Sequence, residues 1–166
     1  MSKDEFKRIR DKFDTEHSIN RIVEIINAGL FDSSNKHIWR QSAFIELMIL
    51  LRDILQKCEK YSTRVDFTDD VLINGYVKDV TDLITAIRDA CCHIDSFKRN
   101  FDENGNTGSH NIIYGKGIAL NIDGLVLGSD YEDEIAYIYG KNRIYVRRHI
   151  IRAFEEAKLK LNEFLK

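Results

Sequence analysis

The feature that most constrains the fold is the apolar segment from about Lys36 to Lys60. Drawn as a helix, it carries apolar side chains on nearly every side: Ile38, Trp39, Phe44, Ile45, Leu47, Met48, Leu50, Leu51, Ile54 and Leu55. A helix that is apolar all round is normally buried by other elements. The segment therefore predicts a central helix with further helices packed around it, and the lack of proline in the sequence fits uninterrupted helices.

Glu46 lies inside the most apolar part of this segment, Ala43 to Leu51. Two interpretations are open for a carboxylate in such a place: an ion pair with a neighbouring arginine at the edge of the helix, or a catalytic role. We favour the ion pair, because a charge taken out of water needs a partner of opposite charge.

The length of 166 residues predicts one domain with a substantial core. A hydrophobic content of 43% and a charged content of 31% are typical of a globular protein. The net charge of -2 and the pI near 6.2 argue against a surface coated for bulk nucleic-acid binding, although a local basic groove stays possible. Residues Met1 to Lys12 are charged throughout and do not resemble a signal peptide. Three cysteines in helical patterns favour a reducing compartment, so we expect a cytoplasmic protein with no membrane span.

Helical patterns also precede and follow the central segment. A short polar helix is predicted over Asp4 to Phe13, and a second helix begins at the N-cap residue Ser18 and ends near Gly29. A long helix is predicted from about Val71 to Phe101. At about 100° per residue, its core side carries Val80, Leu83, Ile84, Ile87, Cys91 and Ile94.

The opposite side of that long helix is small and largely neutral. It carries Thr81, Thr85, Arg88, Asp89, Cys92, His93 and Ser96. A solvated helix face usually carries Lys and Glu, so this composition indicates that another surface comes close. We expect a homodimer that uses this face.

The chain changes character at Asp102, where a turn-rich loop begins. Ile112 to Leu127 alternates like a β-hairpin around Asp123-Gly124. A capping box at Ser129 to Glu132 predicts a short helix over Tyr131 to Tyr139, with a strand as the alternative, and Asn142 is expected to cap a final helix from about Arg143 to Leu165. The predicted fold is thus mainly α, with a helical bundle over residues 1–101, a loop and hairpin insertion over 102–128 and C-terminal helices over 129–166.

Arg88, Asp89 and His93 bring together a fixed cation, a carboxylate and an imidazole. An imidazole can take or deliver a proton near neutral pH, and a guanidinium can grip a phosphate with two hydrogen bonds. Asp89 precedes His93 by one turn and is expected to orient its ring. The three residues predict phosphodiester cleavage through a ribose 2′-hydroxyl, without a metal or another cofactor. Arg88 and His93 are about 140° apart on an ideal helix, so we expect two copies to complete the site across the dimer.

The segment Arg88-Asp89-Ala90-Cys91-Cys92-His93 resembles the motif of the HEPN superfamily: an arginine, four to six intervening residues and a histidine, often with a polar residue after the arginine. The resemblance covers roughly Ile38 to Phe101. It implies an HEPN-like helical bundle, dimerisation through the motif helices and metal-independent endoribonuclease activity. The motif positions carry over to Arg88 and His93, and the polar position to Asp89. The region from Asp102 to Val146 has no counterpart in the resemblance.

Two other arginine–histidine pairs have a comparable spacing, Arg10 with His17 and Arg143 with His149. The first is filled with charged residues, and the second has no polar residue after its arginine. Cys91, Cys92 and His93 together do not predict a zinc site, because neighbours on a helix point about 100° apart and no CxxC pair accompanies them.

Arg148, Arg152 and Tyr145 are expected to cluster on one face of the final helix, close to His149. Cations mixed with an aromatic ring can follow a phosphate backbone and stack on bases. The interpretations are RNA contact or an ordinary solvated helix surface.

Two hypotheses of different classes follow. The first is a homodimeric HEPN-like endoribonuclease, a toxin or phage-defence effector by the family resemblance, with an antitoxin or regulatory protein as partner. The second is a non-catalytic helical dimeric module for protein interaction or for nucleotide or RNA binding. They differ over Arg88 and His93, which a nuclease requires and a scaffold does not.

Overall fold

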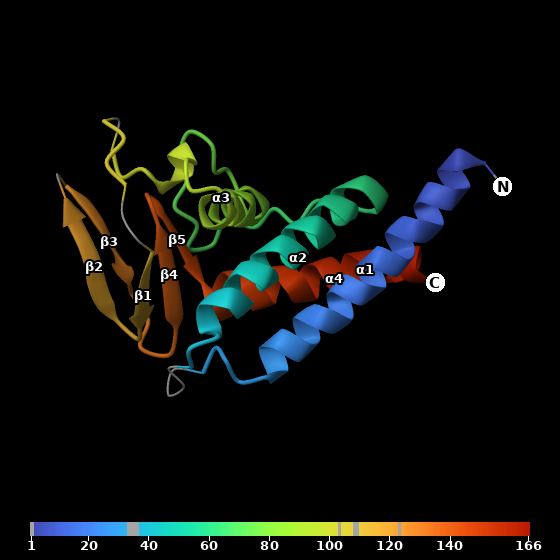
Figure 1. Cartoon of the computed structure of the whole chain (residues 1–166), viewed down its shortest axis with the longest axis horizontal. Helices are drawn as coiled ribbons and strands as arrows, with labels where there is room; N and C mark the ends of the chain where they lie inside the picture. Colours follow the sequence, from blue (N-terminus) through green and yellow to red (C-terminus); the bar gives the residue numbers. More distant parts are fainter. Residues whose placement is uncertain (1, 33–36, 103, 108–109, 123) are drawn as a thin grey trace.

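The computed structural model describes residues 2–32, 37–102, 104–107, 110–122 and 124–166. It is mainly helical, with four α-helices and a small antiparallel β region before the C-terminal helix. The helices are α1 (Lys3–Asn27), α2 (Arg40–Tyr61), α3 (Val80–Cys92) and α4 (Arg152–Leu165), with a 3-10 turn η1 (Phe97–Arg99) and a π-helical turn η2 (Val146–Ile151). The strands are β1 (Asn111–Tyr114), β2 (Gly117–Ile122), β3 (Leu125–Ser129), β4 (Ile135–Tyr139) and β5 (Asn142–Tyr145). In Figure 1 the strands lie at the end of the helices opposite the two chain termini.

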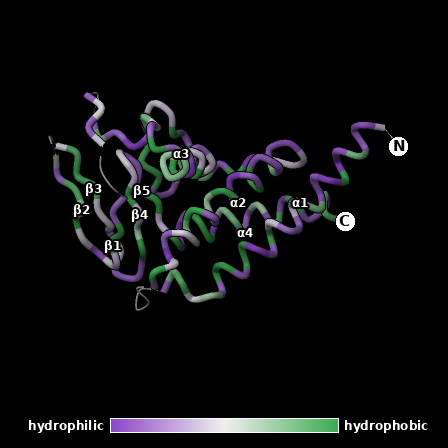
Figure 2. Tube along the Cα trace, viewed as in Figure 1, coloured by the Kyte–Doolittle hydropathy of each residue, from purple (hydrophilic) through white to green (hydrophobic). Residues whose placement is uncertain are grey.

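Helix α2 is the central helix, as the sequence predicts. It packs against α1, α3 and α4, and Figure 2 shows hydrophobic positions along its trace. Its fully buried members are Phe44, Leu47, Met48, Leu51, Ile54, Leu55 and Cys58. Burying a large aliphatic or aromatic side chain stabilises the folded state by about 1.5–3 kcal/mol, so these buried side chains of α2 supply much of the free energy of folding. Ile38 and Trp39 precede the helix and are exposed.

The expected ion pair at Glu46 is confirmed. Arg21 of α1 donates from Nε and Nη2 to the two carboxylate oxygens of Glu46, over 2.6 and 3.0 Å. These hydrogen bonds lower the pKa of Glu46. The carboxylate therefore joins α1 to α2 at the edge of the core.

The two N-terminal helices predicted around Ser18 are one continuous helix, so the expected break is wrong. Ser2 caps α1 in a capping box with Glu5, and Ser18 is buried inside the helix. Buried Thr15 shows why such residues are tolerated there, because its hydroxyl donates to the carbonyl of Asp11 over 2.6 Å. Gly29 follows the helix end with φ +68°, as expected for a C-terminal glycine.

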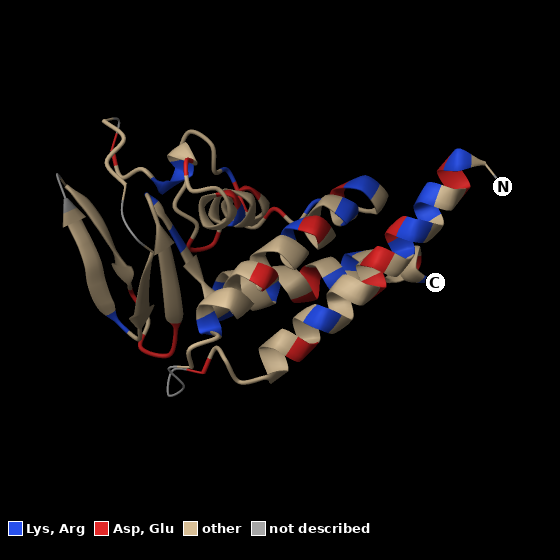
Figure 3. Ribbon diagram, viewed as in Figure 1, with Lys and Arg blue, Asp and Glu red and all other residues tan. Residues whose placement is uncertain are grey.

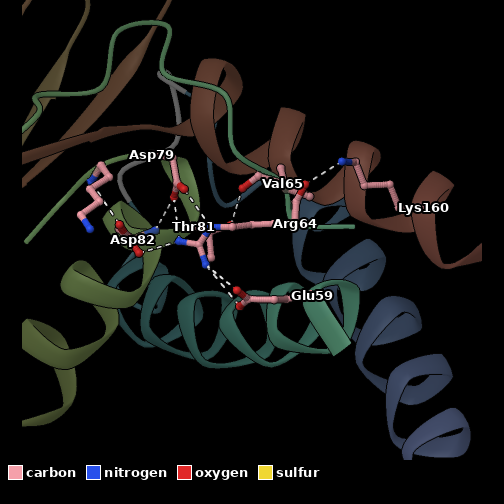
Figure 4. A network of polar contacts seen from close by, with 8 residues as sticks. Glu59, Arg64, Val65, Asp79, Thr81, Asp82 and Lys160 are labelled. Atoms are coloured by element: carbon pink, nitrogen blue, oxygen red, sulfur yellow. Dashed lines mark hydrogen bonds and ion pairs between the residues drawn. The ribbon is translucent and has the colours of Figure 1, made fainter. Parts of the chain in front are cut away.

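The long helix predicted from Val71 to Phe101 is also wrong, since α3 begins only at Val80. The Asp79 side chain accepts the Asp82 backbone N–H and caps the helix, while residues 62–79 form an ordered connection. Figure 4 shows what fixes this connection. Arg64 binds Asp79 through Nε and Nη2, over 2.8 and 3.0 Å, and reaches Asp82 and Glu59 as well.

The same connection explains part of the small neutral face of α3. Thr81 is 5% exposed and its hydroxyl donates to the Val65 carbonyl over 2.5 Å. A larger side chain would displace the chain that lies on it. Thr81 is thus small because its own chain covers it, and it is not part of an open dimer face.

The predicted hairpin is confirmed. Strands β2 and β3 pair antiparallel on either side of Gly124, which has φ +84°; Asp123 lies outside the described residues. A second sheet has the strand order β1-β4-β5, and both of its neighbouring pairs are antiparallel. In Figure 3 the strands are almost free of charged residues, apart from Arg143 in β5.

The helix predicted over Tyr131 to Tyr139 is wrong, and the alternative strand is what forms. Every residue of β4 is buried, and Tyr137 stacks on Phe44 of α2 with ring centroids 3.8 Å apart. Long-range packing on both faces overrides the local capping signal. Asn142 likewise lies in β5, and the final helix starts at Arg152 after the π-helical turn.

Strands β4 and β5 belong to the main core. Ile135, Tyr137, Tyr139 and Ile144 pack in the same cluster as the buried residues of α2 and α3. The β2–β3 hairpin is the peripheral part, with Ile118 and Val126 exposed on it. No helix in the described ranges has the length and apolar character that a membrane crossing needs.

Candidate active site at the end of helix α3

The predicted site residues lie where α3 ends. The backbone leaves the helix at His93, which has φ -123° and ψ 110°, although its N–H still bonds to the Asp89 carbonyl over 3.0 Å. Ser96 then begins the η1 turn. His93 therefore does not continue the helical face on which the sequence placed it, and Ile94, expected in the core, is exposed.

This early end brings Arg88 and His93 together within one chain. Arg88 Nη1 lies 3.2 Å from His93 Nε2, so the separation of about 140° expected from an ideal helix does not apply. A guanidinium can only donate. His93 Nε2 is therefore the acceptor in this contact, with the ring proton on Nδ1, and it is the nitrogen able to accept a proton from a substrate.

Asp89 holds cations and not the imidazole, contrary to expectation. Its Oδ1 accepts from Arg88 Nη1 over 3.1 Å, and its Oδ2 accepts from Lys98 Nζ over 2.5 Å. Partial burial raises the pKa of Asp89, but the hydrogen bonds from Lys98 and Arg88 outweigh it and bring the pKa below its usual value. A charged Asp89 fixes both cations beside His93.

Lys98 is a site residue that the sequence reasoning missed. On the long helix predicted there, it would lie about 180° from Asp89, on the opposite side. Because the chain turns between His93 and Ser96, Lys98 instead lies on the same side as Asp89 and binds it. No pattern in the sequence gives the position of this turn.

A shallow hollow of about 660 Å³ opens beside these groups. Its lining consists of Asp89, Cys92, His93, Ile94, Asp95, Ser96, Phe97 and Lys98. The His93 side chain is exposed to solvent, so a phosphodiester could reach the imidazole without a rearrangement of the core.

The turn between β4 and β5 packs against the backbone at Lys98. Gly140 has φ +54°, and a Cβ atom built on it would clash with the Lys98 carbonyl oxygen and lie 2.9 Å from the Asn100 carbonyl oxygen. Only glycine has both the backbone freedom and the lack of a side chain that this contact requires. The β region thus takes part in shaping the site.

The three residues predicted to bind RNA do not form one exposed face. Tyr145 is completely buried, so its ring is not available for stacking on a base. The guanidinium of Arg148 lies over the Tyr131 ring at 3.4 Å, and that of Arg152 lies over Phe67 at 3.8 Å. Arg148 and Arg152 do line one hollow, of about 470 Å³, but its other lining residues include Asp69, Asp70, Asp133 and Glu134.

His149, from the rival arginine–histidine spacing, is a core residue. It is 0% exposed. The Tyr145 backbone N–H donates to its Nδ1 over 3.1 Å, so the ring proton lies on Nε2, which is 3.1 Å from the Asp69 carbonyl. Burial lowers the pKa of His149 to about 4. This geometry makes His149 a neutral structural residue.

Among the described residues, no group of three or more His, Cys, Asp or Glu side chains is arranged to hold a metal ion. Burial raises the pKa of the Cys91 thiol to about 12.

The chain has no match among protein-family models, curated proteins or solved structures. The resemblance to the HEPN superfamily therefore stays a prediction that rests on the motif residues.

Proposed function

We propose that this protein is a metal-independent, HEPN-like endoribonuclease that uses Arg88 and His93. The observation that supports it most is the 3.2 Å contact between Arg88 Nη1 and His93 Nε2 at the edge of an open hollow. A proton acceptor and a fixed cation lie side by side there, which is what cleavage next to a phosphate needs.

In the proposed reaction, a phosphate of single-stranded RNA replaces His93 as a partner of Arg88. His93 Nε2 then accepts the proton of the 2′-hydroxyl, and the 2′-oxygen forms a bond to phosphorus. The bond from phosphorus to the 5′-oxygen breaks, and that oxygen leaves with a proton from water. The products are a 2′,3′-cyclic phosphate and a 5′-hydroxyl, while Arg88 stabilises the charge on the non-bridging oxygens.

We also propose that two copies meet beside this site and that the protein acts in the cytoplasm as a toxin or defence effector, controlled by an antitoxin or regulatory protein. The half-buried, uncharged side chains of Thr85 and Cys92 on α3 suit a close contact between copies. The effector role comes from the family resemblance alone.

The test is incubation of the purified protein with single-stranded RNA in EDTA, with analysis of the product ends. We expect 2′,3′-cyclic phosphates from RNA and no cleavage of DNA. General acid–base help is worth roughly 10² to 10⁴ in rate and a charge-stabilising donor roughly 10² to 10³. His93→Ala and Arg88→Ala should therefore each reduce cleavage by at least about 10²-fold, and Asp89→Asn by less.

The matched control is His17→Ala. His17 is exposed on α1 and belongs to another arginine–histidine spacing, so its loss should leave the rate unchanged. His149→Ala is unsuitable as a control, because it would remove a buried side chain. Cleavage that survives in the Arg88→Ala, His93→Ala double variant would refute the proposal.

A second candidate function is a non-catalytic helical dimeric module that binds another protein, a nucleotide or RNA. It is favoured by the two ion pairs of Asp89, because its carboxylate neutralises part of the charge of Arg88 and Lys98. A wild-type protein that cuts no RNA but keeps a dimer insensitive to Arg88→Ala and His93→Ala would support this module instead.

A further inference from the structure

Phe97 is a large aromatic side chain that is 62% exposed, directly beside the candidate site. It lines the hollow that contains His93 and Lys98, and it also lines a second hollow of about 330 Å³. The second hollow is otherwise formed by Tyr76, Asn100, Asp102 and Lys141. Phe97 thus separates two depressions of one surface.

The backbone that carries Phe97 is held firmly. Ser96 Oγ accepts the Lys98 N–H, and the Asn100 N–H donates to the Phe97 carbonyl over 3.0 Å. Gly140 packs closely against the backbone of the same turn. An exposed ring on a fixed turn loses little conformational entropy when a ligand stacks on it.

Tyr76 buttresses the Phe97 ring. The two rings meet nearly edge to face, with centroids 5.6 Å apart and planes at 84°. Tyr76 is itself anchored, because buried Asn142 of β5 donates to its hydroxyl over 3.0 Å. The pair therefore presents a fixed aromatic surface to solvent.

Cations lie on both sides of this aromatic surface. Lys98 lines the first hollow, and Lys141 lines the second. Asp89 accepts hydrogen bonds from both Lys98 and Arg88, so the Arg88 guanidinium also lies near the first hollow. Asn100 adds an amide that can donate to or accept from the edge of a base. Proteins bind single strands by alternating cations for phosphates with aromatic faces for bases.

We propose that Phe97 is a stacking platform for a nucleobase of single-stranded RNA, next to the phosphate held at Arg88. The strand runs from the His93 hollow across Phe97 to Lys141, where the next phosphate binds. This inference rests on the proposed function, because it places the base relative to the phosphate that is cut. It assigns RNA contact to the Phe97 side of the molecule and not to Arg148, Arg152 and Tyr145.

The test is the binding of a short fluorescein-labelled oligoadenylate with 2′-O-methyl riboses, measured by fluorescence anisotropy. The probe has no 2′-hydroxyl and is not cleaved. Stacking of a base on an aromatic side chain is worth roughly 5- to 150-fold in Kd, so Phe97→Leu should weaken binding by that range. Phe97→Tyr keeps an aromatic face and should bind within about threefold of the wild type.

Two controls separate stacking from other effects. Phe6→Leu makes the same change at an exposed phenylalanine of α1 and should not alter Kd. An abasic probe of the same length offers phosphates without bases, so the wild type and Phe97→Leu should bind it equally. Equal weakening on both probes, or no binding of oligoadenylate by the wild type, would overturn the inference.

The outcomes also distinguish this inference from the proposed function. Normal cleavage of RNA with binding that ignores Phe97 would overturn the stacking platform alone. Binding that depends on an aromatic residue at position 97, with no cleavage by the wild type, would overturn the ribonuclease alone. A Phe97→Leu protein that binds normally but loses its dimer mass would assign the ring to protein contact and overturn the platform.

Discussion

Acid should destabilise this protein through His149, and His149→Gln should remove that effect. In the folded chain the imidazole is buried and neutral, with Nδ1 accepting from the Tyr145 N–H and Nε2 facing the Asp69 carbonyl. A glutamine side chain offers one acceptor and two donors. It can keep the hydrogen bond to Asp69 while removing the group that takes up a proton.

The magnitude follows from the two pKa values. Burial lowers the pKa of His149 from 6.5 to about 4. Above pH 6.5 the ring is neutral in both the folded and the unfolded chain, so its titration does not affect stability. Between pH 6.5 and 4 the unfolded chain binds the proton and the folded chain does not, so the free energy of unfolding falls as the pH falls. Each pH unit is worth about 1.4 kcal/mol, which gives a loss of about 3 kcal/mol from this residue.

The assay is urea unfolding at several pH values from 7 to 4, for the wild type, His149→Gln and His17→Gln. Other carboxylates titrate in this range too, so the informative quantity is the difference between variants at each pH. The wild type should lose about 3 kcal/mol more than His149→Gln, and His17→Gln should follow the wild type because His17 is exposed on α1. Parallel stability curves for the wild type and His149→Gln would refute the reasoning.

Two further changes test the site from outside its reacting groups. Gly140→Ala should cost at least about 2 kcal/mol of unfolding free energy and lower RNA cleavage, because the new Cβ meets the η1 backbone; Gly124→Ala, where a Cβ would meet nothing within 4 Å, should show only the backbone strain of about 1–2 kcal/mol. Thr85→Arg should lower the light-scattering mass from two chains toward one, because it adds bulk and charge to a close contact, whereas Thr68→Arg on the exposed connection should not. A wild type that is monomeric at high concentration would contradict the dimer.

The central helix and the hairpin could be predicted from the sequence because their signals are local and strong. The α2 segment is apolar on nearly every side, which admits few structures other than a buried helix. Asp123-Gly124 between alternating strands indicates a hairpin by turn chemistry alone. The Glu46 ion pair was predictable for a related reason, since a carboxylate inside an apolar run needs a cation.

The ends of α3 were not predictable in the same way. The Asp79 cap accepts from the Asp82 backbone N–H and from the Arg64 side chain, and Arg64 lies near the other end of the connection that precedes the helix. Periodic apolar residues continue through Val71 and Ile94 beyond the true ends of α3. A helical period alone therefore cannot tell a helix from the turns that flank it.

Strand β4 shows the opposite failure, in which a local signal was misleading. Ser129 to Glu132 has the form of a capping box, yet Ser129 ends β3, and the residues that follow lead into a strand. The sequence Ile-Ala-Tyr-Ile-Tyr is rich in β-branched and aromatic residues. It pairs locally with β5, and its pairing with β1 and its contact with Phe44 are long-range; together these interactions outweigh a cap that is worth about 1 kcal/mol.

The candidate site forms because α3 ends at His93, earlier than the sequence predicts. If the helix had continued through His93, the imidazole and Arg88 would diverge and Lys98 would face away from Asp89. The chain instead turns at His93, and the η1 turn that follows packs against Gly140, about forty residues later in the sequence. The strands are therefore not an appendage to a helical site. They pack against the backbone of η1, which carries Lys98 and Phe97, so any loosening of the β4–β5 turn should alter the proposed RNA binding and cleavage before it disturbs the helices.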